Sequence, residues 1–269
     1  SRSSMALKPR ARFPTSSLRS FSTRRWRLPC STSLIAWVRA DTVLVCTEGY
    51  TARLPGEKRR MLPLYSLMVA TEPLPAEVWE RIGLAERETF SDGRHLLIYG
   101  QRTADDRFAF GGRGAPYHFG SAITDAYDRD RRVAEELAAV LRQLFPALTD
   151  AAIDHHWGGP LGVPRDWAAS VTFDRSRRIG TAGGYVGDGV STTNLAGRTL
   201  ADLVLGHDTE RVRLPWVGHR SRDWEPEPLR WIGVNTGRVL AATLDRRETR
   251  RRRPSPLLEG LFDRVTGGH

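Results

Sequence analysis

The feature that most constrains this chain is a glycine-rich run that leads into a helical pattern, "GGYVGDGVSTTNLAGRTLADLVLG" at positions 183–206. A strand-like stretch, "RIGTAG", comes directly before it. The predicted helix over 191–205 ends at Gly206 and has one apolar side, made of Ala196, Leu200, Leu203 and Val204. Glycine lets backbone approach a ligand closely, and a helix start presents unpaired N–H groups that suit an anion. The sequence therefore predicts a strand–turn–helix unit that can face a ligand.

Physical reasoning alone leaves two interpretations of this turn open. It either holds an anionic or electron-accepting group, or it is only a tight connection between a strand and a helix. A strand followed by GxGxxG is absent from the sequence, and "GGRGAPYHFG" continues with Ala115 and Pro116 where a dinucleotide site needs a helix. The usual phosphate-binding signatures therefore do not explain the turn.

The rest of the chain alternates strand-like and helix-like patterns. A helix is predicted over 128–145, with Pro146 as its end and an apolar stripe of Val133, Leu137, Val140, Leu141 and Leu144. Strands are predicted within 41–47, 61–74, 95–103, 107–114, 169–174 and 178–185. Strands that come first, with helices interspersed later, suggest the α+β or the α/β class.

The net charge of +10 invites a nucleic-acid interpretation. Residues 1–40 carry nine basic side chains and no acidic one, and "RRETRRRR" at 246–253 adds six arginines against Glu248. The basic residues therefore sit at two ends of the chain, whereas a nucleic-acid-binding face interleaves them with aromatics on a folded surface. We expect no nucleic-acid partner.

No apolar run is long enough for a membrane span. Two cysteines are too few for a disulfide framework, so a cytoplasmic location is the default expectation.

Residues 1–33 differ in composition from everything that follows. They are rich in Ser, Arg and Pro and lack acids. Such a stretch cannot bury enough apolar surface to offset its chain entropy, so we expect a disordered basic leader. An organellar transit peptide and a misassigned start are both compatible with this composition. An Arg-rich tail is expected over 246–269.

Five separated motifs occur in an order that resembles one family. They are "ADTVLVCTEGYTARLPG", "LPLYSLMVATEPL", "GRHLLIYGQRTADDRFAFGGRG", "LFPALTDAAIDHHWGGPLGVPRDW" and "AGGYVGDGVSTTNLAGRTLADLVLG". Together they resemble flavin-dependent oxidoreductases of the D-amino-acid/glycine oxidase (DAO) superfamily, of the gamma-glutamylputrescine oxidoreductase-like kind. The resemblance runs from about Ala40 to Glu248. It implies an α/β-type FAD-binding remnant joined to an antiparallel-sheet substrate domain, and it favours a misassigned start over a transit peptide for residues 1–33.

The resemblance implies FAD as the cofactor, although the family's N-terminal GxGxxG unit has no counterpart here. It assigns flavin contacts to segments 40–54 and 151–206 and the substrate domain to about 55–150. The cofactor-binding candidates are Thr47, Glu48, Gly49, Gly184, Tyr185, Val186, Gly187, Asp188, Gly189 and Val190. Backbone N–H groups of the last seven would oppose the negative charge that develops on a reduced flavin. We identify no catalytic acid–base residue and no metal site.

The chemistry implied is oxidation of a C–N bond, with a small amine or amino-acid-like molecule as the substrate and O₂ or a carrier as the electron acceptor. The substrate-binding candidates are Tyr99, Arg113 and Trp157, each of which also has a plain structural interpretation. One departure matters: "GGPLGVPRDW" lacks the Arg with which the family's amino-acid oxidases clamp a carboxylate. An amine is therefore favoured over a free α-amino acid. The alternative is a truncated, catalytically inactive fragment without tight FAD binding.

Overall fold

The computed structural model describes residues 25–28, 36–112, 114, 116–251 and 260, and the chain divides into two compact units. The first unit, Ser1–Val43, contains β1 (Arg25–Leu28) and β2 (Ala36–Arg39), which pair as antiparallel strands. Most of the predicted leader, and of the predicted tail beyond Arg251, lies outside the described residues. The second unit, Leu44–His269, holds the remaining secondary structure except the first residue of β3, and it contains the candidate site residues.

A five-stranded antiparallel sheet of order β5-β6-β7-β4-β8 forms the larger layer of the second unit. Its strands are β4 (Leu62–Thr71), β5 (Phe90–Ser91), β6 (Ile98–Arg102), β7 (Phe108–Gly112) and β8 (Ile153–Val163). The alternating patterns of β4, β6 and β7 predict these strands correctly. Pattern reasoning did not single out β8, which contains "GGP". As an edge strand it tolerates Pro160, which has no N–H to donate to a neighbour.

The first face of this sheet packs against helices. Tyr65, Leu67 and Val69 of β4 point to it and join a core with α1 (Ala76–Ile82) and α2 (Arg131–Leu144). The predicted helix over 128–145 is confirmed as α2. Its start is fixed by the Asp130 carboxylate, which accepts hydrogen bonds from the N–H groups of Arg132 and Val133.

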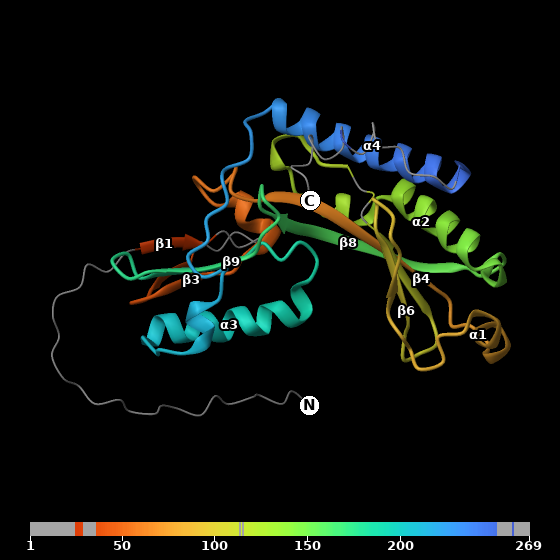
Figure 1. The fold of residues 1–269 in the computed structure, drawn as a ribbon, viewed down its shortest axis with the longest axis horizontal. Coiled ribbons are helices and arrows are strands. Elements are labelled where there is room, and N and C mark those ends of the chain that lie inside the picture. The colour runs from red at the N-terminus through yellow and green to blue at the C-terminus, as the bar shows by residue number, and fades with distance from the viewer. Residues whose placement is uncertain (1–24, 29–35, 113, 115, 252–259, 261–269) are drawn as a thin grey trace. The chain divides into compact units, whose positions relative to one another are not determined.

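A smaller sheet of order β3-β10-β9 carries the predicted strand–turn–helix unit. Its strands are β3 (Val43–Val45), β9 (Ser170–Asp174) and β10 (Ile179–Gly183). The predicted helix is confirmed as α3 (Gly189–Leu205), which packs along β9 and β10 through Ala196 and Leu200 (Figure 1). The predicted turn therefore connects β10 to α3, as the spacing of its glycines required.

The remaining helices are α4 and five short 3-10 turns. α4 (Leu229–Arg251) crosses the boundary that we expected at 245/246. The 3-10 turns are η1 (Glu48–Arg53), η2 (Phe119–Ser121), η3 (Tyr127–Arg129), η4 (Pro146–Leu148) and η5 (Glu210–Arg213). Mixed helices and strands in these layers confirm the predicted α+β class. Among the described residues, no helix combines the length and apolarity needed to cross a membrane.

Candidate functional site

The two segments assigned to flavin contact meet in space. The Tyr185 N–H, at the glycine-rich turn, donates to Glu48 Oε1 at 2.8 Å, across 137 residues of sequence. Gly49 packs so closely on the Pro160 carbonyl of β8 that a side chain there has no room. The turn after β3 and the turn after β10 therefore form one structural junction, in which the Glu48 carboxyl group joins the two turns by a hydrogen bond.

The Glu48 carboxyl is held in a poorly solvated place. Burial raises its pKa above the ordinary value, and the N–H groups of Tyr185, Gly184 and Gly162 oppose that rise. Its Oε2 atom is buried and has no direct hydrogen-bond partner among the described residues. A buried oxygen without a hydrogen-bond partner destabilises the folded protein. A ligand that donates a hydrogen bond to this oxygen at the junction would remove that cost.

The backbone at this junction adopts conformations that most residues avoid. Gly184 and Gly187 have φ of 82° and 104°, which glycine accepts without strain. Val186, with φ of 54°, and Glu48, with φ of 44°, are not glycines and are strained there. Strained backbone persists only where surrounding packing enforces it, and it gathers at functional sites. Val186 is buried against the larger sheet, which supplies that packing.

The first turn of α3 is open. Asp188 occupies the N-cap position, but its side chain makes no capping hydrogen bond, and Val190 is 98% exposed. The backbone N–H groups there lack the side-chain cap that usually satisfies one of them. A group that approaches this end of α3 meets uncapped backbone donors and the positive end of the helix dipole.

Two of the three substrate-side candidates share the second face of the larger sheet. Tyr99 pairs with Gly111 across β6 and β7, and Trp157 pairs with Met68 across β8 and β4. Because Met68 also pairs with Gly111, these positions form one row on one face. Trp157 is 42% exposed there. Arg113, the third candidate, lies outside the described residues.

The same face leads to the glycine-rich turn. Residues of β4 alternate between faces, so Leu62 and Leu64 share the face of Ser66 and Met68. Leu62, with Leu64 beside it, packs in one apolar cluster with Val186 of the turn. Our sequence reasoning missed Ser66 and Met68, although the period-two alternation of β4 places them in this row. The glycine-rich turn therefore packs at the Leu62 end of β4, and Tyr99 and Trp157 lie six residues further along the same face, in the row of Met68.

The missing carboxylate clamp is not replaced by Arg165. Its guanidinium pairs with Glu225 at 3.2 Å and lies over the Trp224 ring, 5.0 Å from the centroid. Only 12% of its side chain is exposed. Hydrogen bonds from its own backbone N–H and from Arg165 hold the pKa of Glu225 below its ordinary value, although burial works in the opposite direction. Arg165 is thus committed to a structural contact.

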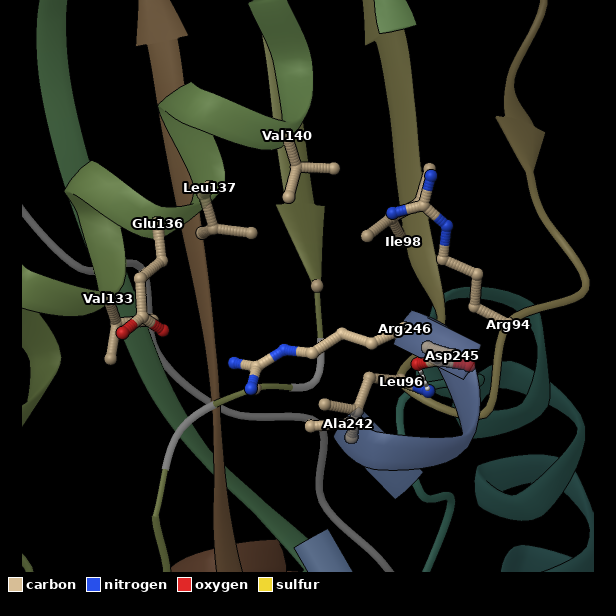
Figure 2. A pocket seen from close by; sticks show the side chains of 12 residues that line it. Arg94, Leu96, Ile98, Val133, Glu136, Leu137, Val140, Ala242, Asp245 and Arg246 are labelled. Atoms are coloured by element: carbon tan, nitrogen blue, oxygen red, sulfur yellow. Dashed lines mark hydrogen bonds between the residues drawn. The ribbon is translucent and has the colours of Figure 1, made fainter. Parts of the chain in front are cut away.

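A pocket of about 200 Å³ lies elsewhere, between α2, β6 and the end of α4 (Figure 2). Ile98, Leu137 and Val140 line it, and the Arg246 side chain reaches from α4 toward Glu136 of α2. Ile98 and Leu137 belong to the core on the first face of the sheet. This pocket is therefore on the opposite side of the sheet from Tyr99 and Trp157, and it takes no part in the predicted site.

One cluster with metal-ligand chemistry occurs beside that pocket. The ligand atoms of His95, Asp245 and Glu248 lie within 4.8 Å of one another. Both Asp245 oxygens accept backbone N–H groups, from His95 at 2.9 Å and Leu96 at 3.1 Å. These hydrogen bonds explain the cluster as a structural contact that joins α4 to the loop before β6.

Comparison with known sequences finds a matching family model and relatives that are all named as oxidoreductases. The family model described as FAD dependent oxidoreductase (DAO) matches residues 12–203, a match that begins inside the expected leader. The probable oxidoreductase OrdL of Haemophilus influenzae is 31% identical over 66% of this chain. Gamma-glutamylputrescine oxidoreductase of Escherichia coli is 30% identical over 65% of this chain. In both cases the match spans only 38% of the relative's own length.

Solved structures show the same fold at low identity. Glycine oxidase from Geobacillus kaustophilus aligns with 74% of this chain and 52% of its own, with a TM-score of 0.54 and 17% identity. A modified fructosyl peptide oxidase from Aspergillus nidulans aligns with 69% of this chain and 47% of its own, with a TM-score of 0.55 and 11% identity. With a family model matched over most of the sequence, the chain belongs to the FAD dependent oxidoreductase (DAO) family.

Proposed function

We propose that this chain supplies the flavin-ring contacts and the substrate wall of an FAD-dependent enzyme that oxidises the C–N bond of an amine. Flavin, when bound, supplies the acceptor for a hydride from the carbon next to the amine nitrogen, and its electrons pass on to O₂ or a carrier. Because the matched part covers 38% of the curated relatives, the activity of a whole enzyme is part of this proposal.

The observation that carries the proposal is the shared face of the larger sheet. Val186 of the glycine-rich turn packs on Leu62 at one end of β4, and Met68, flanked by Tyr99 and Trp157, lies further along the same face. A flat ring that extends from the turn along this face would therefore point toward a partly exposed aromatic wall about 20 Å along the strand. Holding a reactive carbon next to such a ring is mainly a matter of orientation and of water exclusion.

The chain's own residues fit a flavin at this junction. The Tyr185 N–H is already used by Glu48, but the first turn of α3 is uncapped and exposed. Those N–H groups can oppose negative charge on a reduced ring without rearranging. The buried Oε2 of Glu48 accepts a hydrogen bond from a ligand N–H, or donates one when the carboxyl is protonated. Beside it, Gly49 lies against the Pro160 carbonyl, and the Thr47 hydroxyl shares a hydrogen bond with that of Thr51.

An amine substrate is favoured over a free α-amino acid. The stretch 158–167 has no Arg at the place where the family's amino-acid oxidases clamp a carboxylate, and Arg165 is engaged with Glu225. Tyr99 and Trp157 instead offer aromatic faces, which attract alkyl chains and cationic amines. A Trp157→Ala variant should bind amines more weakly.

The proposal is tested by titrating the chain with FAD and with riboflavin and following the quenching of flavin fluorescence. Val190→Asp places a carboxylate at the exposed start of α3, where it competes with the flavin ring for the uncapped backbone N–H groups, and should weaken binding by roughly tenfold. Val239→Asp, on the exposed surface of α4, is the matched control and should leave affinity unchanged.

Two outcomes would contradict the proposal. One is the absence of quenching up to about 1 mM flavin, which corresponds to a binding free energy too small for a cofactor. The other is equal loss of affinity in the Val190 and Val239 variants, which would separate flavin binding from the start of α3. The first outcome would instead favour a fragment without tight FAD binding.

A further inference from the structure

The second face of the larger sheet contains a hydroxyl pair that our sequence reasoning did not find. Ser66 Oγ and the Tyr99 hydroxyl lie 2.7 Å apart, although their strands, β4 and β6, are separated by β7. A Cβ atom on Gly111 of β7 would lie 2.8 Å from Tyr99 Cε2. The Tyr99 ring therefore lies across Gly111, and the absence of a side chain there is what lets its hydroxyl reach Ser66.

The pair is chemically neutral and only half satisfied. Two hydroxyls that share one hydrogen bond keep one O–H donor and free acceptor lone pairs. Either hydroxyl can be the donor, and in both arrangements the other hydroxyl keeps its O–H free. Among the described residues of this face, the only ionisable side chains are those of Tyr99 and His155. The pair thus offers one donor and one acceptor, and the described residues of this face place no acidic side chain beside it.

Space for a ligand group adjoins the pair. Gly159 of β8 lies opposite Ser66, and a Cβ atom built on it would have nothing within 4 Å. Ser66 itself is only 9% exposed, so water reaches its hydroxyl poorly. The partly exposed Trp157 lies two residues before Gly159 on the same face. A polar group that enters above Gly159 meets the hydroxyl pair, with an aromatic surface alongside.

We propose that Ser66 is a specificity-determining residue of this site. With Tyr99 it binds a neutral substrate group that both donates and accepts a hydrogen bond, of which a primary carboxamide is the simplest. This inference rests on the proposed function, because it names the part of the amine substrate that is remote from the oxidised C–N bond. A carboxylate is disfavoured, because two neutral hydroxyls compensate a buried negative charge poorly. A plain alkyl end is disfavoured because it leaves the remaining O–H donor and acceptor of the pair unsatisfied.

The test compares three probes of similar length on the full chain: 4-aminobutanamide, 4-aminobutanoate and butylamine. Isothermal titration calorimetry measures each dissociation constant, independently of any turnover. We expect the amide to bind roughly tenfold more tightly than the other two, as one well-made hydrogen bond permits. Ser66→Ala should abolish that preference, and Gly159→Ala, which fills the open space, should weaken binding of the amide.

Ser176→Ala, in the exposed turn after β9, is the matched control and should retain the preference. Tyr99→Phe removes only the hydroxyl and replaces Ser66→Ala if that variant does not fold. Equal binding of amide and butylamine, tighter binding of the carboxylate, or an unchanged preference in Ser66→Ala would each overturn the inference.

Flavin titration of the same samples separates this inference from the proposed function. Flavin quenching without a preference for the amide refutes only the role of Ser66 and leaves the proposed function standing. Amide preference without flavin quenching refutes the redox function and leaves the hydroxyl pair as a binding site.

Discussion

Gly159 and Gly162 of β8 should respond differently to substitution by alanine, because only Gly162 is tightly packed. A Cβ on Gly162 would overlap the Glu48 carboxyl and would lie 2.9 Å from the Glu48 carbonyl carbon and 3.0 Å from the Gly49 N. A Cβ on Gly159 has nothing within 4 Å. Both changes to alanine reduce the freedom of the unfolded chain equally, by about 0.4–1 kcal/mol. The difference between the two variants therefore isolates the cost of displacing the Thr47–Gly49 segment.

That displacement involves backbone atoms, which cannot rotate away as a side chain can. Overpacking of this kind costs about 1–3 kcal/mol. At about 2–4 °C per kcal/mol for a domain of this size, Gly162→Ala should melt roughly 2–12 °C below Gly159→Ala. Differential scanning calorimetry of both variants measures the gap. Because the shift also moves Glu48 off the Tyr185 N–H, Gly162→Ala should bind flavin more weakly.

Equal melting temperatures, within about 1 °C, would refute this reasoning, because overpacking of that size cannot vanish for a rigid neighbour. They would mean that the segment around Glu48 yields without cost, so that the junction is not a rigid support. A lowered melting temperature with unchanged flavin affinity would keep the packing argument but remove Glu48 from the cofactor site.

Two further perturbations test the carboxyl groups near the site. Burial raises the pKa of Glu48, so the folded protein holds this proton more tightly than the unfolded chain does. The stability of the wild type relative to Glu48→Gln should therefore fall as the pH rises above about 4.3. Urea midpoints of both proteins at acid and neutral pH measure this, and a stability difference that does not change with pH would contradict it. Arg165→Ala should cost about 1–2 kcal/mol through its lost contacts with Glu225 and Trp224, a modest value because Glu225 is partly exposed. Since the pKa of Glu225 is lowered, the part of this cost that comes from Glu225 should disappear as the pH falls below about 4.3, and an Arg165→Ala cost that does not shrink in acid would argue against the ion pair.

The sequence by itself determined the elements whose signals are local. α2 is specified by an N-cap Asp130, an apolar stripe and Pro146, and the strand–turn–helix unit is specified by its glycines. α4 was not predicted, because its apolar residues do not form one stripe: Trp231, Ile232 and Val239 are exposed, whereas Ala241 and Leu244 are buried. Its place is set by packing against the rest of the unit and not by its own periodicity.

The tertiary structure alone decided how the site is assembled. Strand register puts Tyr99, Met68 and Trp157 in one row and lets the Tyr99 hydroxyl cross Gly111 to Ser66. Chain folding brings Glu48 to the N–H of Tyr185. Pairings between strands far apart in the sequence depend on which faces are buried together, and local propensity carries no information about that choice. Candidate residues such as Glu48, Tyr99 and Trp157 could thus be named from the sequence, but the shared face of the two aromatics and the unpartnered Glu48 oxygen follow only from the fold.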